Sequence, residues 1–273
     1  AAPSAPSAPT SPSPTPAPDS LSHLSLEEQA AFPPTSSAGV FHQIGRKHGT
    51  DKITHHGYHR FYPRFIEHFQ SLRGASMLEI GVDQSHSLHT WLEYFPHAFV
   101  YGIDIDIEAK GDRYKIFKAD QSKRADVKRL VDVQIKHPLF LVVDDGSHVP
   151  EHQVQCFDYL FQKLLPGGAY IVEDIETSYW TRNGLYGYTT RYGFHHEKSA
   201  VEVFKDLLDD VNREFLSENS RKTQERRVGA EVCQATRRLI SSVTFGQNCI
   251  IVMKKTEEEL QYHDRVYRFR NNL

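Results

Sequence analysis

The sequence predicts an α/β protein built on an open, doubly wound parallel sheet. Short apolar runs rich in β-branched residues alternate with segments of helical periodicity, and several runs stop abruptly at acidic residues. Buried parallel strands show this pattern, and their carboxyl ends lie at one edge of the sheet. Ligands of open α/β sheets bind at that edge. Five such runs are present, at residues 77–81, 99–106, 114–122, 139–144 and 168–174.

The first three runs suggest a site for an adenosine-containing cofactor. The first contains Glu79 and ends at Gly81, just before a helix. A glycine in such a turn lets a ligand approach the backbone closely. The second run ends at Asp104, and an acid placed about 20 residues after the glycine turn typically binds ribose hydroxyls. The third run leads to Asp120. Strands alternating with helices in this way predict the first half of a doubly wound fold.

The next two runs end in acids that suggest a metal site. One leads to Asp144, Asp145 and His148, and the other ends at Glu173 and Asp174. Carboxylates that converge at one sheet edge repel each other unless a cation or a proton lies among them. Mg²⁺ prefers oxygen ligands and leaves positions open for water or substrate. The alternative is that these acids are helix N-caps and loop residues.

The end of the chain predicts a covering loop, a helix and a hairpin. Residues 175–197 lack a clear period, and a loop of that length is uncommon unless it is functional, so we expect it to cover a substrate. Residues 200–215 form an amphipathic helix whose apolar stripe belongs to the core. The runs 237–245 and 248–255 are joined by a tight turn at Gly246–Gln247, which makes the last strand antiparallel.

The N-terminal part differs from the rest. Residues 1–36 are rich in Pro, Ala, Ser and Thr, so we expect a disordered tail or stalk. Residues 37–273 form the folded domain, divided into a lid-like helical segment (37–72) and a Rossmann-like core (73–273). The segment holds a dense group of polar and aromatic residues that includes Asp51, His56 and Tyr58. It forms either a lid over the site or a helix cap followed by a surface turn.

Composition limits the classes of partner. A length of 273 residues suits one α/β domain with additions, and a net charge of −3 gives no argument for a nucleic-acid partner. No apolar run approaches the ~18 residues of a membrane span. Three widely separated cysteines argue against a disulfide framework and a structural zinc site. The sequence leaves the oligomeric state open and is compatible with a homo-oligomer. It also leaves open whether the protein is cytoplasmic or lumenal on a Pro-rich stalk.

Six motifs over residues 44–254 carry a family resemblance. They read GTDK…HGY…Y (49–62), LEIGV…SL (78–88), WLEYFPHAFVYGIDID (91–106), ADQS (119–122), DDGSH (144–148) and VEDIETSYW (172–180). In this order they resemble class I S-adenosylmethionine-dependent methyltransferases, and in particular the metal-dependent sugar O-methyltransferases of macrolide biosynthesis, of the mycinamicin and demethylmacrocin type. The resemblance implies a Rossmann-like, doubly wound sheet of seven strands with the last strand antiparallel.

The resemblance also implies roles for individual residues. A divalent cation, Mg²⁺ or another, is held by Asp145, Glu173 and Asp174, and the general base is His148. The S-adenosylmethionine site comprises Glu79, Gly81, Ser87, Asp104, Asp120, Gln121 and Asp144, with Asp104 at the ribose and Asp120 and Gln121 at the adenine. Candidate substrate contacts are Asp51, His56, Tyr58, Tyr179 and Trp180. One departure concerns residues 83–86, Asp-Gln-Ser-His, which stand where related enzymes usually carry further glycines.

The expected function is Mg²⁺-dependent methyl transfer from S-adenosylmethionine to a hydroxyl of a sugar, a glycan or a glycosylated small molecule with vicinal hydroxyls. Chelation of a diol lowers the pKa of one hydroxyl. An imidazole, with an ordinary pKa of ~6.5, then removes the proton, and the alkoxide attacks the sulfonium methyl group in line. Three alternatives stay open: a catechol-like or other diol acceptor, a catalytically silent binding domain, and a nicotinamide-dependent oxidoreductase. The last would normally show G-x-G-x-x-G, whereas this chain has only Gly81 there.

Overall fold

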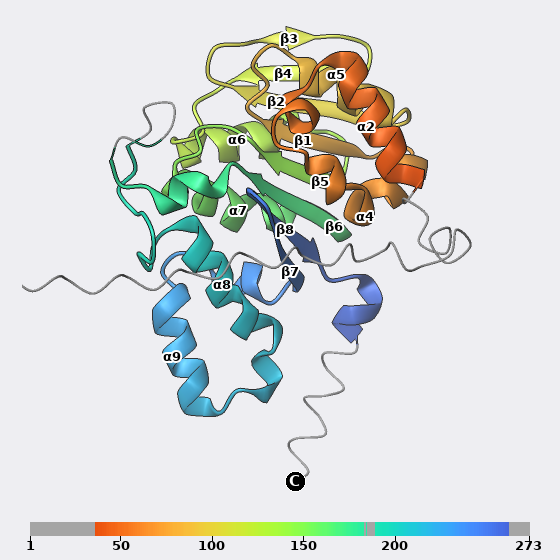
Figure 1. Ribbon diagram of the computed structural model, residues 1–273. Helices are drawn as coiled ribbons and strands as arrows, with labels where there is room; N and C mark the ends of the chain where they lie inside the picture. Colours follow the sequence, from red (N-terminus) through yellow and green to blue (C-terminus); the bar gives the residue numbers. More distant parts are fainter. Residues whose placement is uncertain (1–35, 183, 185–188, 262–273) are drawn as a thin grey trace, which may run out of the picture. The chain divides into compact units, whose positions relative to one another are not determined.

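The computed structural model describes residues 36–182, 184 and 189–261 and shows one eight-stranded sheet between helices (Figure 1). The tail predicted for residues 1–36 therefore lies outside the described residues except for Ser36. The strand order is β3-β4-β2-β1-β5-β6-β8-β7. The strands are β1 (Ser76–Ile80), β2 (Phe99–Asp104), β3 (Ala109–Lys110), β4 (Tyr114–Lys118), β5 (Leu139–Asp144), β6 (Leu164–Glu173), β7 (Ile240–Gly246) and β8 (Cys249–Lys254).

The predicted doubly wound fold with an antiparallel last strand is confirmed. Strands β4, β2, β1, β5 and β6 pair in parallel, whereas β8 is antiparallel to both β6 and β7. The strand count is eight rather than seven because the two-residue β3 pairs with β4, and two residues are too few to show a period. The last turn is also displaced by one residue. Gly246 still belongs to β7, and Asn248 adopts the left-handed conformation (φ 61°).

Helices cover both faces of the sheet (Figure 1). Helices α6, α7 and α8 lie on one face, and α2, α4 and α5 lie on the other. Every residue of β5 is buried, which is the signature of a parallel strand covered on both sides. The helices are α2 (Ser36–His48), α3 (Asp51–Thr54), α4 (Pro63–Ile66), α5 (His86–Tyr94), α6 (Arg124–Gln134), α7 (Pro150–Lys163), α8 (Ala200–Val211), α9 (Glu218–Val228) and α10 (Gln234–Arg237).

The segment predicted to be lid-like is packed into the core. Phe41, Tyr58 and Tyr62 are fully buried on the α5 side of the sheet. The His56, Tyr58 and Tyr62 rings stack in succession, with centroids 5.1 Å apart at each step. Tyr58, in the middle of these rings, donates a hydrogen bond to Asp174 after β6, so the segment reaches the carboxyl edge of the sheet.

The C-terminal part contains elements that the sequence did not predict. The predicted helix 200–215 ends at Val211. Of its expected apolar stripe, Val201, Phe204 and Leu207 are buried, whereas Leu208, within the helix, and Phe215, beyond its end, are exposed. Helices α9 and α10 follow, and a buried ion pair between Arg237 and Asp210 (2.9 Å) ties α10 to α8.

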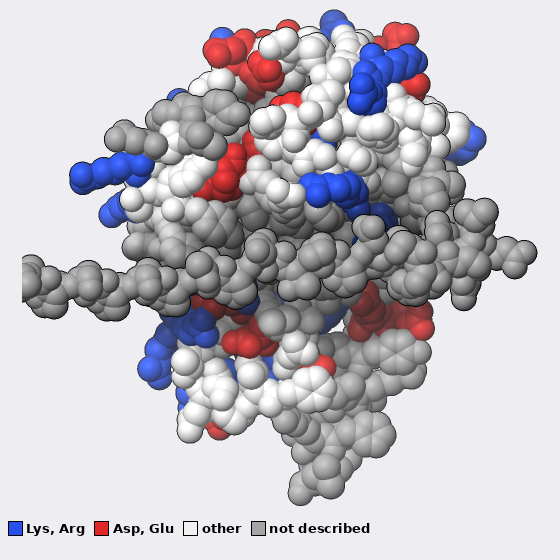
Figure 2. Space-filling view, in the orientation of Figure 1, with Lys and Arg blue, Asp and Glu red and all other residues white. Residues whose placement is uncertain are grey.

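The surface gives few further constraints. Figure 2 shows basic and acidic side chains interspersed over the described part of the face in view. Among the described residues, no helix is both long and apolar enough to cross a membrane.

Candidate active site

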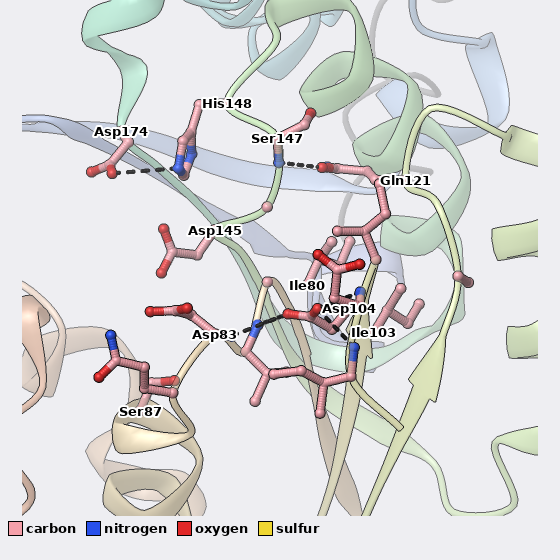
Figure 3. A pocket seen from close by; sticks show the side chains of 18 of the residues that line it. Ile80, Asp83, Ser87, Ile103, Asp104, Gln121, Asp145, Ser147, His148 and Asp174 are labelled. Atoms are coloured by element: carbon pink, nitrogen blue, oxygen red, sulfur yellow. Dashed lines mark hydrogen bonds and ion pairs between the residues drawn. The ribbon is translucent and has the colours of Figure 1, made fainter. Parts of the chain in front are cut away.

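A cavity of about 730 Å³ opens at the carboxyl ends of β1, β2, β4 and β5 (Figure 3). Five of the predicted cofactor residues line it, namely Gly81, Ser87, Asp104, Asp120 and Gln121. Of the predicted metal ligands and base, Asp145, His148 and Asp174 line the same cavity. The topology thus brings together residues that are far apart in the sequence.

The turn after β1 requires its glycine. Gly81 has φ +82°, and a Cβ atom built on it would lie 2.0 Å from the carbonyl oxygen of Asp145. The following loop lacks the further glycines of related enzymes, yet Asp83 (φ 42°) and Ser85 (φ 66°) also adopt left-handed conformations. Such conformations cost non-glycine residues roughly 1–3 kcal/mol each. The loop therefore adopts, with Asp83 and Ser85, backbone conformations that glycine adopts more readily.

Asp104 is held by the backbone around it. One carboxylate oxygen accepts hydrogen bonds from the N–H groups of Val82 and Asp83, and the other accepts from Asp106 and Ile107, over 2.8–3.2 Å. Burial acts to raise the pKa of Asp104, but these four donors outweigh it and the pKa is lowered. The predicted ribose-binding acid lines the cavity, and it also fixes the path of the loop after β1.

Two predicted cofactor residues, Glu79 and Asp144, are fully buried behind the cavity wall. Glu79 accepts hydrogen bonds from the Trp91 indole (2.9 Å) and the Ser87 hydroxyl (2.8 Å). Asp144 accepts from the Gln121 amide (2.6 Å) and the Tyr170 hydroxyl (2.9 Å). Burial raises the pKa of Asp144 to about 7. Neither carboxyl group lines the cavity, so their contacts support it from within.

Gln121 connects Asp144 to the loop after β5. Its side-chain amide donates to Asp144, and its carbonyl oxygen accepts from the backbone N–H of Ser147 (2.7 Å). A Cβ on Gly146 would lie 2.4 Å from that same carbonyl oxygen. The DDGSH segment is therefore positioned by a side chain from the loop after β4, a contact that spacing alone does not reveal.

Asp145, His148 and Asp174 form the cavity side of the acid cluster. One potential ligand atom from each lies within 4.8 Å of the others, and His148 Nε2 is 3.8 Å from Asp174 Oδ2 (Figure 3). His148 (φ 52°) and Asp174 (φ 53°) both adopt left-handed conformations, which commonly occur at functional sites. Two carboxylates beside an imidazole suit a hard divalent cation that keeps some water or substrate ligands.

Lys52 contacts the acid cluster, although the sequence assigned it no role. Its fully buried ammonium lies 2.5 Å from Asp145, 2.8 Å from Glu173 and 3.5 Å from Glu79. Burial acts to lower the pKa of Lys52, but these carboxylates outweigh it and hold the pKa well above its ordinary value. Glu173, the third predicted metal ligand, is therefore paired with a lysine, and its carboxyl group does not line the cavity. Lys52 belongs to the GTDK motif, which gave no indication of these partners.

The acid cluster carries more negative charge than Lys52 compensates. Burial raises the pKa of Asp145, and burial together with the charge of Asp145 raises the pKa of Glu173, although Lys52 opposes both shifts. Three carboxylates surround the single ammonium of Lys52, so a further positive charge beside Asp145 would reduce the repulsion among them.

The predicted substrate residues occupy different places. Asp51 lines the cavity. Tyr58 donates a hydrogen bond to Asp174 (2.7 Å), and His56 Nδ1 lies 3.4 Å from the same carboxylate. Tyr179 is exposed and Trp180 is partly buried; both belong to the predicted covering loop, of which residues 183 and 185–188 lie outside the described residues.

Asn248 also contacts the acid cluster, and the sequence gave no indication of this. Its side-chain amide donates to Asp174 (3.0 Å) from the turn between β7 and β8. The last hairpin therefore contributes to the site.

Comparison with solved structures identifies the fold. The chain superimposes on the MycE methyltransferase of the mycinamycin pathway, in complex with Mg, SAH and mycinamycin VI, with a TM-score of 0.67. The alignment covers 80% of this chain and 54% of that chain, at 24% sequence identity. The chain has the class I methyltransferase fold. No protein-family model matches it.

Comparison with named proteins gives the sequence relatives of this methyltransferase-fold chain. It is 33% identical over 223 residues to an 8-demethyl-8-alpha-L-rhamnosyl tetracenomycin-C 2'-O-methyltransferase of Streptomyces olivaceus, which covers 78% of this chain and 54% of the relative. It is 35% identical over 168 residues to the mycinamicin VI 2''-O-methyltransferase of Micromonospora griseorubida, covering 58% and 41%. The predicted resemblance to macrolide sugar O-methyltransferases is confirmed. The chain spans about half the length of these relatives or less.

Proposed function

We propose that this protein is an S-adenosylmethionine-dependent, metal-assisted O-methyltransferase that acts on a sugar hydroxyl of a glycosylated small molecule. The observation that carries the proposal is the meeting of His148 with Asp145 and Asp174 at one cavity. The sequence relatives are named for methyl transfer to a rhamnosyl tetracenomycin and to mycinamicin VI, which supports a sugar-bearing acceptor.

The cavity suits a cofactor of this kind. A volume of about 730 Å³ falls within the range of small-molecule and cofactor pockets. Gly81 leaves the backbone accessible where a side chain would collide with Asp145. Asp104, Asp120 and Gln121 lie along the same wall, where they can position polar groups of a nucleoside.

The residues beside the cavity have different roles in the proposed reaction. A divalent cation bound at Asp145 and Asp174 would supply Lewis-acid polarisation of the acceptor oxygen. His148 Nε2 is the atom that accepts the hydroxyl proton in this proposal. Asp174 Oδ2, 3.8 Å away, stabilises the imidazolium that results. Tyr58 and Asn248 hold Asp174 in place through hydrogen bonds to its other oxygen.

Two measurements test the proposed function. Calorimetric titration with S-adenosylmethionine, S-adenosylhomocysteine and NADH, each with and without Mg²⁺, is expected to show binding of the two sulfur compounds alone. A methyl-transfer assay with labelled S-adenosylmethionine then compares a glycosylated polyketide with its aglycone and with a catechol. We expect transfer to the glycoside only, loss of turnover with EDTA, and recovery on addition of Mg²⁺.

Variants locate the activity in this site. His148→Ala is expected to lower kcat by roughly 10²–10⁴-fold, the usual contribution of a general base. His97→Ala serves as a matched control and leaves kcat unchanged, because His97 is exposed and precedes β2, at the edge of the sheet opposite the cavity. Full turnover in a metal-free preparation, or an active His148→Ala enzyme, would contradict the mechanism. Transfer to the catechol alone would assign a different acceptor class.

A further inference from the structure

Two exposed aromatic residues of the loop after β6, Tyr179 and Phe194, lie against each other and are called the aromatic pair below. Tyr179 is 46% exposed and Phe194 is 60% exposed. Their ring centroids are 5.8 Å apart and their planes are inclined by 28°, which is a stacked arrangement. Single exposed apolar residues are common on protein surfaces, whereas adjacent exposed rings form a patch of the kind that binds ligands.

Contacts within the loop hold the aromatic pair in place. The buried Thr190 hydroxyl donates a hydrogen bond to the carbonyl oxygen of Thr177 (3.0 Å). A Cβ atom built on Gly193 would lie 2.6 Å from the carbonyl oxygen of Trp180, so the backbone before one ring lies directly against the backbone after the other. The two rings are therefore brought together by the fold of the loop.

The same loop is attached to the proposed base. The buried Thr177 hydroxyl donates to the carbonyl oxygen of His148 (2.5 Å). Tyr179 ends the 3-10 helix η3 (Ile175–Tyr179), which begins directly after Asp174. A 3-10 helix rises by ~2 Å per residue, so the Cα atom of Tyr179 lies roughly 10 Å from that of Asp174. This distance leaves room for a sugar ring between the aromatic pair and the groups of the proposed reaction.

The arrangement of the cavity places the acceptor on the side of the aromatic pair. Figure 3 shows His148 and Asp174 at one side of the cavity and Asp104 and Gln121 at the other. In the proposed function, Asp104 and Gln121 belong to the nucleoside side, and the sugar hydroxyl lies at His148. The part of the acceptor beyond its sugar, the aglycone, then extends away from the nucleoside and toward η3.

We propose that Tyr179 and Phe194 form a binding surface for an apolar, ring-containing aglycone of the glycosylated acceptor. Neither side chain carries a charge, so covering the two rings removes mainly apolar surface from water, and an apolar ring can stack on them. This inference rests on the proposed function, because it names the class of aglycone for that same acceptor.

The experiment is a calorimetric titration in the presence of S-adenosylhomocysteine and Mg²⁺, and it needs no turnover. The probes are 2-naphthyl α-L-rhamnoside and methyl α-L-rhamnoside, which share a sugar with vicinal hydroxyls and differ in the aglycone. The wild type is expected to bind the naphthyl glycoside at least ~tenfold more tightly, as for the burial of an aromatic side chain. The quantity compared among variants is the ratio of the two Kd values, because a general loss of folded protein affects both probes equally.

Variants of the aromatic pair test its role. Tyr179→Ala and Phe194→Ala are each expected to reduce the ratio to about threefold or less, with the Kd of the methyl glycoside within about twofold of the wild-type value. Tyr179→Phe keeps the ring and is expected to keep the wild-type ratio. Phe215→Ala is the matched control, because it removes a ring that is 66% exposed beyond the end of α8, and it is also expected to keep the ratio.

Three results would overturn the inference. They are equal affinity of the wild type for the two probes, an unchanged ratio in both alanine variants, and equal weakening of both probes in a Tyr179→Ala protein that still binds S-adenosylhomocysteine. The last result would mean that the ring contacts the sugar. A wild type that binds S-adenosylhomocysteine but neither rhamnoside would instead contradict the sugar-acceptor function itself, and this inference with it.

Discussion

The buried carboxyl group of Asp144 predicts a measurable pH dependence of stability. It is fully buried, accepts hydrogen bonds from Gln121 and Tyr170, and lies behind the cavity wall. Burial raises its pKa from the ordinary value of 3.8 to about 7. Between pH 3.8 and about 7, the folded protein therefore holds a proton that the unfolded chain has released. The stabilisation is complete below pH 3.8 and is lost as the pH rises through about 7.

The size of the effect follows from the shift of the pKa. One pKa unit corresponds to about 1.4 kcal/mol, so a shift of about three units makes the stabilisation at low pH worth about 4 kcal/mol. Part of the loss occurs below pH 5, and about 2–3 kcal/mol remains to be lost between pH 5 and pH 8. Asp144→Asn removes this titration. An asparagine still accepts from Gln121, and its amide can donate to the Tyr170 hydroxyl.

Urea unfolding of the wild type and of Asp144→Asn, at pH 5 and pH 8, measures the difference. From pH 5 to pH 8, the wild type should lose about 2–3 kcal/mol more of its free energy of unfolding than the variant does. Asp112→Asn, the same change at an exposed carboxylate, is the control and should show no such gain. Parallel pH profiles for the wild type and Asp144→Asn would refute the reasoning, because they would show that Asp144 is ionised in the folded protein.

Two further predictions concern the loops at the cavity. Tyr58→Phe removes the hydroxyl that donates to Asp174. A hydrogen bond to a charged group is worth about 1.5–3 kcal/mol, so kcat/KM for methyl transfer should fall at least ~tenfold. Tyr159→Phe, which loses a comparable bond to Asp132 far from the site, should leave kcat/KM unchanged; equal values for both variants would contradict the role of Tyr58. Ser85→Gly relieves a left-handed conformation and should raise the free energy of unfolding by about 0.5–1 kcal/mol in urea titration, whereas a decrease would show that the serine is not strained there.

Much of the fold follows from local signals in the sequence. The apolar runs that predict parallel strands lie within a few residues of β1, β2, β4, β5 and β6, because buried parallel strands need continuous apolar residues. Helix α9 was not predicted, since it consists mostly of charged and polar residues and shows little amphipathic pattern. Strand β3 was not predicted either, because two residues are too few to show a period.

The sequence predicts the positions of site residues that follow strand ends. It does not predict contacts between side chains that are distant in the sequence. The acids Asp104, Asp145 and Asp174 follow strands that the sequence predicts, so their convergence follows from the topology. The choice of partner for each acid does not. Lys52 is 93 residues from Asp145 and 121 residues from Glu173 in sequence, and no local pattern indicates these pairings.

The protein itself holds the geometry of the proposed catalytic groups. His148 and Asp174 both adopt conformations that cost non-glycine residues free energy, so other contacts must hold them. Thr177 supplies such a contact, because its buried hydroxyl donates to the carbonyl oxygen of His148 (2.5 Å) and so joins the loop after β5 to the loop after β6. Tyr58 and Asn248 donate hydrogen bonds to Asp174, so contacts hold both the proposed base and its neighbouring carboxylate. A site held in this way is preorganised, so ligand binding loses little conformational entropy in these groups.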